Sequence, residues 1–170
     1  GMQVFDLTDP EDPRPVHILP LEHNGLMFQE GDRVYIRGKS EIGIYWLGNL
    51  PYIHLVERVR LEPGGSPLHC SSFRVSEGIV YAITFPAWLS VVDVRDPFRP
   101  VLLNRIEAAP AENWRYDLGF LNRTVFVTSI HQVDSSVQTS IKAFRIEPDG
   151  SLVPALDYPT EFPVERYVEL

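Results

Sequence analysis

The side chains that could carry chemistry are scattered along this chain and form no recognised catalytic motif. The five histidines are His17, His23, His54, His69 and His131, and the single cysteine is Cys70. The sequence contains no Gly-x-Ser-x-Gly nucleophile turn, no phosphate-binding glycine loop, no His-Glu-x-x-His and no Cys-x-x-Cys. It therefore assigns no catalytic residue, and Cys70 is expected to be a small buried side chain, as free cysteines usually are.

A regular spacing nevertheless places some of these residues in equivalent positions. Val34, Val80 and Val125 lie in similar apolar segments and are 46 and 45 residues apart. When the segments are aligned on these valines, His23 falls opposite His69, shortly before the segment begins. Because imidazole nitrogens are common metal ligands, His23 and His69 are the candidate ligands if a divalent metal binds.

The same alignment adds a cation and an anion. In this alignment Arg115 lies one position after the residue opposite the two histidines, and Asp117 lies three positions after it. If the aligned segments surround one axis, His23, His69, Arg115 and Asp117 converge at the mouth of a central channel and predict a metal site or polar-ligand site there. The commoner situation is structural, because equivalent positions of a repeat share residue types for packing or for bonding the loop backbone.

Length and composition predict one globular domain. The chain has 170 residues and a mass of 19.4 kDa, with 44% hydrophobic and 22% charged residues. The net charge of −8 and the pI near 5.1 argue against binding to nucleic-acid phosphates. No apolar run approaches the length of a membrane span, and no basic segment followed by an apolar one predicts a signal peptide.

Two segments of the sequence repeat each other closely. Residues 3–10 read Gln-Val-Phe-Asp-Leu-Thr-Asp-Pro, and residues 90–97 read Ser-Val-Val-Asp-Val-Arg-Asp-Pro. Arg-Pro-Val follows in both, with two extra residues in the first turn. Asp-Pro is expected to be a structural turn, because proline lacks the N–H that continues a strand and aspartate bonds the turn backbone.

Weaker copies complete a longer pattern. The four copies align on Asp6, Trp46, Asp93 and Arg145, with spacings of 40, 47 and 52. Each copy starts an outer strand pair, and tight hairpins rich in β-branched and aromatic residues lie between the copies, at 26–36, 73–82 and 118–127. The sequence thus predicts an all-β chain of about 14 short strands, arranged as the four-stranded antiparallel blades of a β-propeller. A β-sandwich is the alternative.

The repeat also resembles a known family. The run Val-Val-Asp-Val-Arg-Asp-Pro-Phe-Arg-Pro-Val at 91–101 resembles the LVIVD repeat of bacterial and archaeal β-propeller proteins, and residues 5–16 are similar. The segment at 146–152 instead looks like a turn of lactonase-type propellers. The LVIVD resemblance implies the fold and an exported or cell-surface location in a prokaryote; it implies no activity, because propellers host many functions.

The predicted blades do not complete a ring. The single domain 1–170 divides into an outer strand pair at 2–21, blades at 25–67, 68–116 and 117–158, and a C-terminal tail at 159–170. Propellers typically close with about four to eight blades, and an open stack leaves sheet faces and edges exposed. We expect completion by a second copy or by the remainder of a longer propeller. Return of the tail as a strand beside the orphan pair is the third option.

These observations favour a non-enzymatic scaffold for protein–protein interaction or self-assembly. The expected partners are a second copy, the rest of a longer propeller, or another protein, and no cofactor is expected beyond the divalent metal considered above. The first alternative is a hydrolase or lactonase-like enzyme with a metal or polar-ligand site at the central channel. The second is a carbohydrate-binding surface that uses aromatic side chains in loops.

The sequence also predicts the environment of several aromatic side chains and one surface loop. Four aromatic side chains are expected to pack between blades: Tyr45, Trp46, Phe85 and Trp88. Residues 131–139 are polar and have no strand period, so they are expected to form a surface loop.

Overall fold

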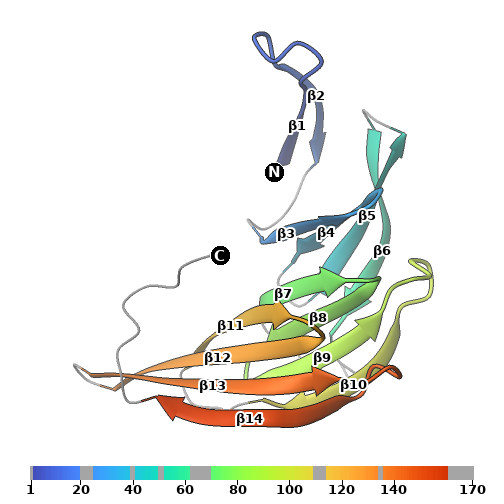
Figure 1. The fold of residues 1–170 in the computed structure, drawn as a ribbon. Helices are drawn as coiled ribbons and strands as arrows, with labels where there is room; N and C mark the ends of the chain where they lie inside the picture. Colours follow the sequence, from blue (N-terminus) through green and yellow to red (C-terminus); the bar gives the residue numbers. More distant parts are fainter. Residues whose placement is uncertain are drawn as a thin grey trace.

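The computed structural model describes residues 2–19, 25–38, 41–49, 52–61, 70–108, 114–133 and 136–160, and all its regular elements are strands (Figure 1). They are β1 (Met2–Asp6), β2 (Arg14–Leu19), β3 (Met27–Glu30), β4 (Arg33–Arg37), β5 (Glu41–Asn49), β6 (Tyr52–Arg60), β7 (Cys70–Ser76), β8 (Ile79–Thr84), β9 (Trp88–Asp93), β10 (Val101–Glu107), β11 (Trp114–Leu121), β12 (Thr124–Val133), β13 (Ser136–Ile146) and β14 (Leu152–Thr160).

Every strand pairs antiparallel with its neighbour in sequence. Strands β3–β6 form one four-stranded sheet (blade 1), β7–β10 form a second (blade 2), and β11–β14 form a third (blade 3). The pair β1–β2 is a separate two-stranded sheet, the N-terminal hairpin. The predicted all-β fold with four-stranded antiparallel blades is therefore confirmed.

The blades stack through their first strands. Strand β7 contacts both β3 and β11, so these three strands lie along the inner side of the stack (Figure 1). Strands β6, β10 and β14 are at the opposite edge of each sheet. This order of inner and outer strands is the one that the repeat predicts.

The register shows that the blades are true structural repeats. At the end of each β-ladder the aligned residues pair directly: Arg33 with Trp46, Ile79 with Asp93, and Thr124 with Arg145. The next residue of the third strand donates its N–H to the inner turn in every blade: Leu47 to Asp32 O (2.7 Å), Val94 to Gly78 O (2.9 Å), and Ile146 to Arg123 O (2.8 Å). The alignment made from the sequence is therefore correct residue by residue at these positions.

The N-terminal hairpin shares a β-bulge with the outer strand pairs of the three blades. In all four outer pairs one residue of the second strand is skipped by the pairing: Val16, Val56, Leu103 and Ala155. Such bulges bend the strand and increase its twist, so a shared bulge indicates a shared shape. Within the described residues no inner pair accompanies β1–β2, and the ring is not closed.

The Asp-Pro turns are structural, as predicted. The Oδ1 atom of Asp6 accepts the Thr8 N–H at 2.8 Å, and the Oδ1 atom of Asp93 accepts the Arg95 N–H at 2.9 Å. Further along each turn, Asp9 and Asp96 accept an N–H two residues later, both at 3.1 Å. These bonds hold the turn backbone where proline prevents further strand pairing.

The hydrophobic core lies between the blades as two clusters. Tyr35, Ile42 and Ile44 of blade 1 pack with residues of blade 2 that include Phe73 and Val80. The other face of blade 2 supplies Tyr81, Ile83, Leu89 and Val91, which pack against blade 3. Alternate residues of a strand point to opposite faces, so a middle blade must be apolar on both.

Two expectations about side chains were wrong. Trp46 and Phe85 are 38% and 43% exposed, because Trp46 lies at the end of its ladder beside a turn and Phe85 lies in the turn after β8. Tyr45 and Trp88 are half-buried.

The prediction of a surface loop at 131–139 was also wrong. It is largely strand, since β12 runs to Val133 and β13 starts at Ser136. Polar residues here continue a hairpin whose backbone bonds do not depend on an apolar pattern.

Candidate functional site

The inner strands of the three blades are joined by polar contacts. Ser72 of β7 is 1% exposed and donates a hydrogen bond of 2.8 Å from its Oγ to Asp117 Oδ1 of β11. The Arg74 guanidinium lies 4.0 Å from the same carboxylate and 4.8 Å from the centre of the Phe28 ring of β3. These contacts tie all three blades together along the inner side.

Of the four residues that the sequence places at a channel mouth, two are described. Asp117 is held by Ser72, and its side chain remains 57% exposed. Arg115 is exposed on the same strand and shares a face with Asp117, because they are two residues apart. His23 and His69 lie outside the described residues. The structure thus brings Arg115 and Asp117 to one face and leaves the convergence of the whole set as a prediction.

The metal hypothesis depends on the same two histidines. Among the described residues, no group of three or more His, Cys, Asp or Glu side chains could hold a metal ion. A metal site therefore stays a prediction that involves His23 and His69.

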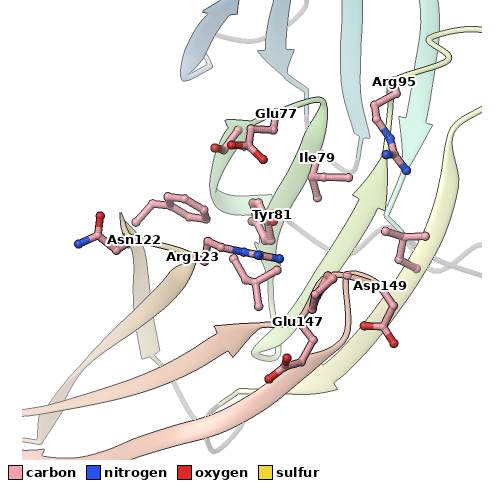
Figure 2. Close-up of a pocket in the computed structure, with 14 residues that line it drawn as sticks. Glu77, Ile79, Tyr81, Arg95, Asn122, Arg123, Glu147 and Asp149 are labelled. Atoms are coloured by element: carbon pink, nitrogen blue, oxygen red, sulfur yellow. The ribbon is translucent and has the colours of Figure 1, made fainter.

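A cavity of about 410 Å³ opens between blades 2 and 3, beside the turns β7–β8, β11–β12 and β13–β14 (Figure 2). Tyr81 lines it and is only 3% exposed; burial raises the pKa of its phenol to about 12, partly countered by the positive charge of Arg123. Tyr81 is therefore a neutral hydroxyl at physiological pH. In Figure 2 the Arg123 side chain reaches into the cavity beside it.

A second, more apolar groove of about 630 Å³ lies between blades 1 and 2. Trp46 stands edge-to-face with His54, with ring centres 5.5 Å apart, and donates its indole N–H to Asp32 Oδ2 at 2.7 Å. Phe98, which is 70% exposed, comes from the β9–β10 turn. Stacking surfaces of this kind suit apolar or aromatic ligand groups.

Cys70 is buried, as the sequence predicted. Burial raises the pKa of its thiol to about 12, with a smaller opposing effect of Arg37. The thiolate is the nucleophilic form, so Cys70 is not an activated nucleophile.

Sequence comparison identifies no relative: no protein-family model and no curated protein matches the chain. Solved structures do resemble it. A europium-containing methanol dehydrogenase matches with a TM-score of 0.60 and 13% identity, over 83% of this chain and 25% of the other. A hypothetical selenium-binding protein from Sulfolobus tokodaii matches with a TM-score of 0.59 and 14% identity, over 86% of this chain and 44% of the other.

The fold is that of a β-propeller with an open ring. Both neighbours have propeller-type folds, and this chain spans less than half of either. At such low identity the likeness concerns the fold alone. The described residues include no helix long and apolar enough to cross a membrane.

The sequence analysis missed Tyr81 and Arg123 as possible site residues. Tyr81 looks like any core aromatic in an apolar strand. The available signal was Asn122-Arg123 at a tight turn, where both residues have positive φ (47° and 62°) and glycine is the usual choice.

Proposed function

We propose that this chain is a non-enzymatic binding module of the LVIVD-repeat type, which associates with further blades supplied by a second copy of itself. The observation that carries the proposal is the outward face of blade 3. It matches the blade-binding faces of blades 1 and 2, but no blade of the described residues packs against it. The repeated Asp-Pro turns support the family assignment.

Equivalent residues define the blade-binding face. Tyr35 pairs with Ile44 in blade 1, Tyr81 pairs with Val91 in blade 2, and both pairs are buried against the next blade. The same register pairs Phe126 with Ala143 in blade 3. Phe126 is partly exposed where its counterparts are almost fully buried. The aromatic side chain at this position is therefore buried in blades 1 and 2 and partly exposed in blade 3.

Other apolar side chains share the face of Phe126, which also carries the charged Arg115, Asp117 and Arg145. We call the open face the set of five apolar side chains on this side of blade 3: Leu121, Phe126, Ile130, Ile141 and Leu156. Leu121 and Leu156 are 61% and 51% exposed. Contiguous apolar surface of this kind marks an interaction site more often than a scattered exposed leucine does.

The N-terminal end of the chain offers the complementary half. In blades 2 and 3 the preceding blade packs against the face that carries Val80 and Val125. The equivalent residue in blade 1 is Val34, which is 5% exposed, and within the described residues β1 of the N-terminal hairpin pairs only with β2. We infer that one copy's open face packs against another's N-terminal end as consecutive blades do. Head-to-tail contacts of this kind close into rings when the rotation allows.

The experiment compares two charge substitutions on exposed phenylalanines. Phe126→Lys places a cation in the open face, whereas Phe98→Lys changes a more exposed ring on the β9–β10 turn. Sedimentation equilibrium should show self-association that Phe126→Lys weakens by about a hundredfold or more, since an unpaired buried charge costs several kcal/mol, while Phe98→Lys leaves it unchanged. Equal association of both variants would refute the assigned interface. An unassociated wild type would favour blades from a longer chain instead.

No observation favours the hydrolase alternative. It requires His23 and His69, which lie outside the described residues, and the Ser72–Asp117 contact includes no histidine base among the described residues.

A further inference from the structure

The cavity between blades 2 and 3 contains two polar groups whose bonding capacity is unused. Neither the Arg123 guanidinium nor the Tyr81 hydroxyl has a hydrogen-bond or ion-pair partner within the part of the chain that the structure describes, although Arg123 acts electrostatically on Tyr81. Tyr81 is 3% exposed as a residue, and it lines the cavity. Both groups lie side by side in Figure 2.

Arg123 occupies this place at a conformational cost. Its φ of 62° lies in the left-handed region, where side chains with a Cβ are disfavoured. The equivalent residue of blade 2 is Gly78, with φ of 69°, and both carbonyls accept the same inter-strand N–H bond. Glycine would therefore serve the turn without strain. Strained residues concentrate where a side chain is needed for function.

The charges around the cavity disfavour a ligand with more than one negative charge. The Arg95 guanidinium is already paired with Asp93, and Glu147 is paired with Arg145 at 2.8 Å. Glu77 and Asp149 also border the cavity and would repel a second negative charge. One unpaired guanidinium beside a neutral hydroxyl therefore suits a monoanion, and it suits a phosphate or dicarboxylate poorly.

We propose that this cavity binds a small monocarboxylate with an apolar body, its carboxylate on Arg123 and Tyr81. The apolar side chains Ile79, Leu103, Phe120 and Ile146 line the cavity and would cover the body of the ligand. The volume of about 410 Å³ is within the usual range for small-molecule sites. The site lies on contacts within one chain, so it is independent of the self-association proposed above.

Calorimetric titration with phenylacetate tests the site in the intact chain. Saturable binding at about millimolar affinity or better is expected, with phenylacetamide and inorganic phosphate much weaker because one lacks the charge and the other the apolar body.

Arg123→Gln should weaken phenylacetate binding by about tenfold or more, and Tyr81→Phe should weaken it several-fold. Arg99→Gln, which removes an exposed arginine outside the cavity, should change nothing. Absence of saturable binding up to about 20 mM, or equal effects of Arg123→Gln and Arg99→Gln, would overturn the proposal.

A second variant separates function from stability. Arg123→Gly removes the guanidinium and the strain together, so it should raise the melting temperature while it abolishes phenylacetate binding. A lower melting temperature would show that Arg123 is retained for packing, and would also overturn the proposal.

Discussion

Tyr81 and Phe126 hold the same position in consecutive blades, and among the described residues a following blade covers Tyr81 but not Phe126. Tyr81 is 3% exposed and its ring centre lies 5.1 Å from that of Phe120 in blade 3. Phe126 is paired in the same register but is partly exposed. A stack of repeats buries each blade face against a neighbour, so the last face of an open stack keeps its apolar surface available. This difference underlies the binding function proposed for the chain.

Ser72→Ala tests the polar contact between the inner strands. Because Ser72 is 1% exposed and bonds Asp117, its removal should destabilise the chain by about 1 kcal/mol. In a double-mutant cycle with Asp117→Ala, urea denaturation should show a coupling well above the roughly 0.3–0.5 kcal/mol scatter of independent sites. Ser71→Ala is the matched control on the adjacent residue. Additive effects of the Ser72 and Asp117 changes would mean that the contact contributes nothing.

Asp93→Asn tests the turn that the repeat motif encodes. The hydrogen bond from Arg95 is the main reason that the pKa of Asp93 lies below its ordinary 3.8. A lowered pKa in the folded state stabilises the protein above that ordinary value, and the benefit is lost as the pH falls from 3.8 through the folded pKa. The variant should therefore lose about 1 kcal/mol at neutral pH, a modest figure because Arg95 is exposed, and the difference should shrink at about pH 2.5.

Thermal denaturation at the two pH values measures this difference. Asp6→Asn in the exposed N-terminal hairpin serves as the comparison and should have the smaller effect. A pH-independent loss in Asp93→Asn would point to turn geometry rather than charge.

The Cys70 thiol should be inert in the native protein. It is fully buried, and burial raises its pKa to about 12. A disulfide reagent such as Ellman's reagent should therefore react at the rate of unfolding at about pH 8, and immediately once guanidinium chloride is added. Complete reaction of the native chain within the mixing time would contradict the burial of this side chain.

The sequence was sufficient to predict the blades and their alignment. Period-two apolar segments recur at intervals of 40, 47 and 52 residues, and two of the four copies end in Asp-Pro. Trp46 and Asp93, which the repeat aligns, therefore occupy equivalent positions in blades 1 and 2. Ser72 and Asp117 are 45 residues apart, as Val80 and Val125 are, and the structure joins these equivalent positions by a hydrogen bond.

The cavity could not be predicted in this way. It depends on a backbone conformation at Arg123 that sequence periodicity does not encode, and on the position of the Tyr81 hydroxyl in the cavity, which is known only in three dimensions. The exposure of Trp46 was missed for a related reason: an aromatic residue in an apolar strand predicts burial, whereas its position at the end of the ladder determines the outcome.

The most direct test of the account is the mass of the wild-type chain in solution, measured by light scattering after size exclusion over a range of concentrations. The proposed association through the open face predicts a mass near twice 19.4 kDa, falling towards the single-chain value on dilution. A mass of 19.4 kDa at every concentration would contradict it.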